Sequence, residues 1–201
     1  MKSGMLDRIR AVGHWRVVFR PLTALPEKLS LQRGFDAVEK ARVSIRGWDF
    51  PHISRRDDDQ GGTERAGDFI ENWCDWQTQV EFWRMYRSGQ FLAYTALNDD
   101  MVAAARNDSA RQLEIVDAIY TVTEFFEFGF RLAQAGLYRQ GFHANVKLIG
   151  SANRPLVAGR GRMGFFSPHT TSADTVELER TVDAAKLDEG ALETSLSALL
   201  E

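Results

Sequence analysis

Apolar and polar residues alternate with a period of two in several parts of the chain, and this alternation predicts a mainly antiparallel sheet. The pattern is clear from His14 to Arg20, where Trp15 and its alternate neighbours are apolar, and Pro21 then ends the strand because it cannot donate a ladder hydrogen bond. The same period predicts further strands over Phe69–Trp76, Thr78–Tyr86, Gln90–Leu97, 142–148 and 176–182.

Apolar residues at helical spacing predict three helices. One is expected over Pro26–Lys40, with Pro26 near its first turn. The longest is expected to begin at a capping box of Ser109 and Gln112 and to end near Gly136. Its second half is apolar most of the way round, so we expect it to be buried between layers. A last amphipathic helix is expected over Asp188–Leu200.

These elements predict an α+β fold, with a mainly antiparallel sheet, one long central helix and short flanking helices. The sequence contains no internal repeat and no Pro-rich or Ser-rich linker that would divide it. We therefore expect a single domain over residues 1–201.

The strand pattern changes phase at Gly47. Apolar residues before it share one strand face, and those after it have the opposite phase, which is the effect of a β-bulge. We therefore expect a bulged strand in segment 42–53, followed by a mobile loop over 54–67. The bulge would bring polar groups and stacking rings together, and these are Arg46, Trp48, Asp49, Phe50 and His52.

Composition describes an ordinary globular protein: 28 acidic against 25 basic residues give a net charge of −3, and 44% of the 201 residues are hydrophobic. A collagen-like, disulfide-stapled or wholly disordered chain is excluded. The single cysteine, Cys74, fits a reducing compartment. No stretch reaches the ~18 apolar residues of a membrane helix, and charges interrupt the first twelve residues. We therefore expect a cytoplasmic protein with no membrane partner.

No motif identifies a cofactor, a metal or a nucleophile. The four histidines are far apart, and Asp57–Asp59 is a charge run typical of a solvated loop, so no metal or cofactor is expected. Residues 159–164 match G-x-G-x-x-G, but they lead into Phe165-Phe166-Ser167-Pro168, which begins no helix. We expect a glycine-rich loop there, or a shallow anion site formed by Arg160 and Arg162.

The leading hypothesis is a non-enzymatic binding or protein-interaction domain, with an unknown protein or a small anionic ligand as partner. The predicted binding residues are Arg46, Trp48, Asp49, His52, Arg87, Arg160 and Arg162. A simpler interpretation is that Arg46 and Asp49 only satisfy each other's charge at a sheet edge. One alternative is a phosphodiesterase or nuclease that uses His52 with Asp49 and Arg46 around a phosphate.

The second alternative is nucleic-acid binding through arginines interleaved with aromatic residues. The arginines in question are Arg16, Arg20, Arg84, Arg87, Arg160 and Arg162. Oligomeric state and ligand identity do not follow from the sequence.

Three stretches carry a family resemblance: Arg46–His52, Tyr86–Phe91, and Glu124–Leu132 with Gly136 and Tyr138. They resemble the region that accompanies AlbA-like, Schlafen-type DNA-binding modules in uncharacterised bacterial proteins, and the likeness covers residues 14–160. The resemblance implies a bacterial cytoplasmic domain that accompanies ligand-associated or nucleic-acid-associated proteins. The DNA-binding module itself is absent, so none of its residues is assigned here.

Overall fold

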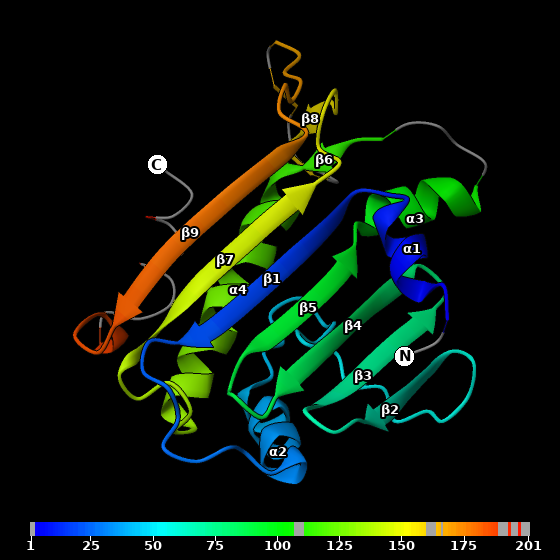
Figure 1. Cartoon of the computed structure of the whole chain (residues 1–201). Helices are drawn as coiled ribbons and strands as arrows, with labels where there is room; N and C mark the ends of the chain where they lie inside the picture. The colour runs from blue at the N-terminus through cyan, green and yellow to red at the C-terminus, as the bar shows by residue number, and fades with distance from the viewer. Residues whose placement is uncertain are drawn as a thin grey trace.

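A computed structural model describes residues 3–106, 111–159, 164–165, 167–188, 193 and 197. Seven antiparallel strands form one sheet, and the long helix α4 (Ile115–Gln134) crosses one of its faces (Figure 1). The strands in spatial order are β2 (Gly61–Arg65), β3 (Phe69–Trp76), β4 (Gln79–Tyr86), β5 (Phe91–Ala96), β1 (His14–Pro21), β7 (Gly141–Ile149) and β9 (Thr175–Asp183). The predicted α+β fold with one long helix is confirmed.

The remaining elements are short. They are α1 (Met5–Arg10), α2 (Leu31–Ala41), α3 (Asn98–Ala105), η1 (Lys186–Asp188), and a parallel strand pair of β6 (Leu113–Glu114) with β8 (Leu156–Val157). Sequence periodicity did not predict α1 or α3, because each spans too few turns to establish a stripe. Within the described residues, no helix has both the length and the apolar character needed to cross a membrane.

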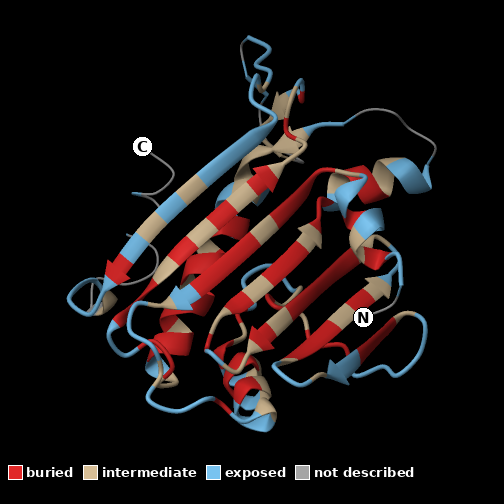
Figure 2. Ribbon diagram, viewed as in Figure 1, coloured by how far each residue is buried: buried red, intermediate tan, exposed pale blue. Residues whose placement is uncertain are grey.

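The main core lies between the sheet and α4. Phe125, Phe126 and Phe128 of α4 are all buried, and Phe128 packs on Phe91 of β5 with ring centroids 4.6 Å apart. Helix α2 packs against both α4 and β4, and most positions of the second half of α4 are buried, although a stripe at Thr123, Glu127 and Arg131 is partly exposed. Buried residues run along β4, β5, β1 and β7, whereas β9 is mostly exposed (Figure 2).

Several predicted boundaries were wrong. Helix α2 begins at Leu31 rather than Pro26, because the Ser30 hydroxyl accepts the Arg33 backbone N–H at 3.1 Å and caps the first turn. Helix α4 begins at Ile115, so Gln112 lies before it, and Ser109 of the expected capping box lies outside the described residues. Most of the expected helix over 188–200 also lies outside them.

The expected mobile loop over 54–67 contains a strand. Residues Gly61–Arg65 form β2 at one edge of the sheet and pair with β3. A Cβ atom at Gly62 would lie 2.7 Å from the indole of Trp73, so a glycine is needed where the strand passes that ring. Gly61 and Gly62 also remove the apolar alternation by which the strand could have been predicted.

A buried ion pair joins distant parts of the chain at the end of the sheet where β1 begins. Arg154 donates to both carboxylate oxygens of Asp100 on α3, at 2.5 and 2.6 Å, and each side chain is only 1% exposed. Asp100 also accepts the backbone N–H of Gly13 at 2.7 Å. Arg154 donates further to the carbonyls of Gly150 at 2.7 Å and Gln112 at 3.3 Å. The pair therefore fixes α3, the start of β1 and the approach to β6 relative to one another.

We expect Asp100→Asn to lower the free energy of unfolding by about 3–5 kcal/mol, because it leaves the Arg154 charge buried without its partner. Urea unfolding followed by tryptophan fluorescence measures this loss. Lys147→Met removes a partly exposed partner of Glu177, and we expect it to cost less than about 1 kcal/mol. Equal losses in the two variants would contradict the assigned role of the buried pair.

Candidate functional site

Residues 44–49 form a loop, which we call the Arg46 loop. It is closed by two backbone hydrogen bonds between Val43 and Phe50, at 2.9 and 2.8 Å. Gly47 has φ +89°, so the glycine is needed for the loop conformation. The expected bulged strand was wrong: Val43 and Phe50 form a single isolated bridge, and residues 44–49 between them form no strand.

Arg46 holds this loop against α4. Its guanidinium pairs with Asp117, donates to the Thr121 hydroxyl at 3.0 Å, and pairs with Glu124 at 2.5 Å. The Glu124 side chain is only 3% exposed, whereas that of Arg46 is 30% exposed. Successive turns of the helix therefore present three acceptors to one arginine that is about 70 to 80 residues earlier in the chain.

Asp49 and His52 have partners of their own. Asp49 accepts from Arg42 at 2.6 Å. This ion pair, between residues close together in the sequence, replaces the expected pairing of Asp49 with Arg46. The His52 ring stacks on Trp48, with centroids 4.1 Å apart and planes 16° from parallel. Burial lowers the pKa of His52 by more than the nearby Asp49 carboxylate raises it. The three polar groups predicted to act together therefore point to different partners.

Trp48 is oriented by Glu81, a residue that sequence reasoning missed. Glu81 lies on β4, is 3% exposed, and accepts the Trp48 indole N–H at 2.5 Å. Burial raises its pKa to about 7, and the hydrogen bond from Trp48 only partly opposes this effect. The available signal was its position: Glu81 shares a strand face with Trp83 and Met85, which are core residues. A carboxyl group on such a face is unusual.

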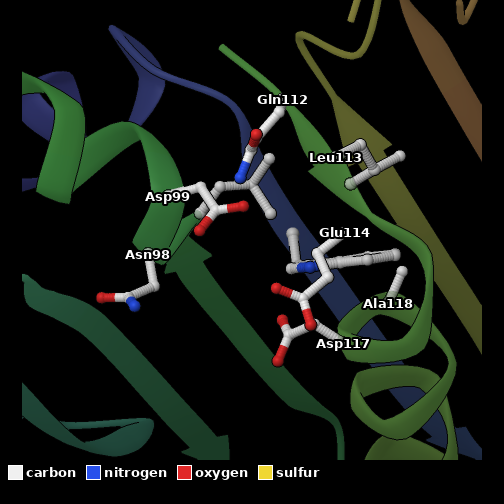
Figure 3. A pocket seen from close by; sticks show the side chains of 9 residues that line it. Asn98, Asp99, Gln112, Leu113, Glu114, Asp117 and Ala118 are labelled. Carbon is white, nitrogen blue, oxygen red and sulfur yellow. The ribbon is translucent and has the colours of Figure 1, made fainter. Parts of the chain in front are cut away.

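Two adjoining cavities open between α3, the Arg46 loop and the first half of α4. The acidic cavity, of about 160 Å³, is lined by Asp99, Glu114 and Asp117 with the amides Asn98 and Gln112. Figure 3 shows the carboxylates of Asp99, Glu114 and Asp117 directed toward the same space. No group of three or more metal-ligating side chains placed to hold a metal ion occurs in the described part of the chain.

The aromatic cavity, of about 210 Å³, lies beside the acidic cavity. The residues common to both walls are Trp15, Leu97, Asn98 and Asp117. Its aromatic wall is formed by Trp15, Trp48, Phe50 and Phe125, and its charged groups are Arg46, Asp49, Glu81, Asp117 and Glu124. We call the two cavities together the cleft. Of the predicted site residues, Arg46, Trp48 and Asp49 line it, whereas His52 stacks on Trp48 and is not part of the wall.

The other predicted basic residues lie away from the cleft. Arg87 donates to the Leu29 carbonyl at 2.9 Å, near the turn between β4 and β5. Three more lie on the sheet face opposite α4, where each has a polar partner: Arg16 with Asn145, Arg20 with Gln90, and Arg84 with Glu71. Arg160 and Arg162 of the expected anion site lie outside the described residues.

Comparison with protein-family models, with curated proteins and with solved structures found no match. The resemblance to the region beside AlbA-like, Schlafen-type modules therefore stays a prediction. Functional conclusions must rest on the cleft itself.

We expect Arg46→Met to lower the free energy of unfolding by about 3 kcal/mol, because Glu124 is then left buried without its cation. Chemical unfolding measures the change. Arg42→Met is the matched control: its pair with Asp49 is partly exposed on both sides, and we expect a loss below about 1 kcal/mol. A larger loss in the control than in Arg46→Met would contradict the role assigned to Arg46.

Glu81 makes stability depend on pH. Its pKa of about 7 in the folded chain lies above the ordinary 4.5, so the stabilisation from its proton is complete below pH 4.5 and is lost as pH rises through 7. Glu81→Gln has no proton to lose. We expect its stability relative to the natural chain to rise between pH 5 and 8, by up to about 3 kcal/mol.

Urea unfolding at several pH values measures this difference. The exposed Glu27 gives a baseline through Glu27→Gln. A constant difference between Glu81→Gln and the natural chain across this range would show that the Glu81 carboxyl is ordinary.

Proposed function

We propose that the chain is a non-enzymatic binding domain whose cleft takes a small organic cation. The observation that carries this proposal is the charge of the cleft wall. Among the described residues that line the two cavities there is one basic side chain, Arg46, against six acidic ones. The six are Asp49, Glu81, Asp99, Glu114, Asp117 and Glu124. A cleft lined by one sign of charge concentrates ligands of the opposite sign.

The single positive charge does not reverse this field. Arg46 is paired with Asp117 and Glu124, so its charge is more than matched by its own partners. Asp49 is matched by Arg42. Glu114 also lies on the wall, and neither Arg46 nor Arg42 pairs with it to neutralise its charge. A ligand that enters the cleft therefore meets an excess of negative charge in a partly desolvated space, where the attraction is stronger than in water.

The same charges disfavour the anionic ligands expected from the sequence. A phosphate would have to draw Arg46 away from Asp117 and Glu124 and would then lie among carboxylates. The nuclease hypothesis also requires His52, which stacks behind Trp48 rather than lining the cleft. On the outer face of the sheet, acidic residues such as Glu71 and Glu177 pair with the basic ones, which weakens the case for a nucleic-acid surface.

Isothermal titration calorimetry with ions of similar size tests the proposal. The cations are butylammonium, butylguanidinium and choline, and the anions are butyrate and phosphate, all at one ionic strength. We expect at least one cation to bind with a dissociation constant below about 1 mM, and neither anion to bind. Binding of phosphate as tight as that of the best cation, or no binding of any cation, would overturn the proposal.

Two variants locate the binding. We expect Glu114→Gln to weaken cation binding at least about threefold, because it removes one charge from the wall. Glu27→Gln removes the same charge from the exposed loop beyond the far end of β1, and we expect the affinity to stay within about twofold. Equal weakening in both variants would place the attraction in the net charge of the protein rather than in the cleft.

A further inference from the structure

We propose that the cation bound in the cleft is a quaternary ammonium group on a short polar arm, as in choline. This inference rests on the proposed function and names the class of ligand. It follows from the aromatic wall, from the existing partners of the carboxylates and from the size of the two cavities.

Three of the rings that line the aromatic cavity pack on one another, and little of each is exposed. Trp15 meets Phe125 edge to face with centroids 5.7 Å apart, and Phe125 lies 4.5 Å from Phe50. Trp48 lines the same space and is held by Glu81. Aromatic rings, tryptophan most strongly, attract cations and pack well against methyl groups. Trp15 is common to both cavities, so a cation beside it also lies near the acidic wall.

The carboxylates of the aromatic cavity already accept hydrogen bonds from the protein. Asp49 accepts from Arg42, Glu81 from Trp48, and both Asp117 and Glu124 from Arg46. A primary ammonium has three N–H donors, and in the aromatic cavity they would have to share these carboxylates with the donors already bound to them. A quaternary ammonium has no N–H group. It therefore gains the attraction of the carboxylates without sharing their hydrogen bonds.

The two cavities have room for the two parts of such a ligand, the quaternary ammonium group and its polar arm. A cavity of about 150 Å³ is enough to hold a benzene molecule. The aromatic cavity, about 210 Å³, therefore has room for a trimethylammonium group. The acidic cavity beside it presents the amides of Asn98 and Gln112 and the Glu114 carboxylate, which can bond to a hydroxyl on the arm.

Calorimetry with three ligands of related shape tests this inference. They are choline, ethanolamine and 3,3-dimethylbutan-1-ol, which has the shape of choline without the charge. We expect choline to bind about tenfold or more tightly than either of the others. Ethanolamine binding as tight as choline would overturn the inference and leave the proposed cation site standing. Equal binding of the neutral alcohol would overturn both, because charge would then contribute nothing.

The aromatic wall is tested by replacing one indole. We expect Trp15→Leu to weaken choline binding about tenfold while changing ethanolamine binding less than twofold. Trp73→Leu is the control, since Trp73 packs against the separate core cluster that contains Met5 and Phe82 and is not part of the cavity wall. Equal weakening of both ligands by Trp15→Leu would overturn the proposed role of the ring.

A second measurement keeps the inference testable if Trp15→Leu does not fold, because Trp15 is itself largely buried. In two-dimensional NMR of the natural chain, we expect choline to shift the indole N–H signal of Trp15 and to leave that of Trp73, which lines neither cavity, unchanged. Signals would be assigned with Trp15→Phe and Trp73→Phe. A choline titration that shifts neither Trp15 nor Trp48 would overturn the inference.

Discussion

The buried pair of Arg154 and Asp100 is the constraint on which the geometry of the cleft depends. Two opposite charges with almost no access to water must stay together, because either one alone would be expensive to bury. Asp100 lies on α3 directly after Asn98 and Asp99, which line the cleft. Arg154 also holds the carbonyl of Gln112, another residue of the wall. One side of the cleft is therefore fixed by an interaction that takes no part in the cleft itself.

The opposite side is held differently. The Arg46 loop lies outside the sheet strands and is attached to α4 by a guanidinium that is partly exposed. Water and salt screen such contacts more than they screen the Arg154 pair. Nevertheless Glu124 is buried, so the loop carries a cation that the helix requires. The cleft thus combines a rigid wall, fixed in the interior, with a wall whose position depends on charges facing the ligand space.

The sequence predicted the parts of the structure that depend on local periodicity, but not those held by ion pairs between distant residues. Period-two alternation located β3 and β4 to within about one residue, because a half-buried strand repeats its environment at every second position. It failed at residues 42–53, where the phase change at Gly47 was interpreted as a bulge. Residues 44–49 instead form a loop that Arg46 attaches to Asp117 and Glu124. These partners are far along the chain, and no local sequence pattern predicts them. Glu81 was overlooked although its position at a period of two from Trp83 and Met85 placed it on the core face of β4.

The protonation state of Glu81 would couple the charge of the cleft wall to the binding of a cation. Burial raises the pKa of its carboxyl, donors from Trp48 and the His52 backbone oppose the rise, the neighbouring Glu124 and Asp49 carboxylates add to it, and the resulting pKa is about 7. Near neutral pH the group is therefore divided between its neutral and ionised forms. A cation beside it would favour the ionised form, and the ionised form would in turn attract the cation more strongly. Binding a cation and losing the Glu81 proton would therefore reinforce each other if the cleft binds a cation as we propose.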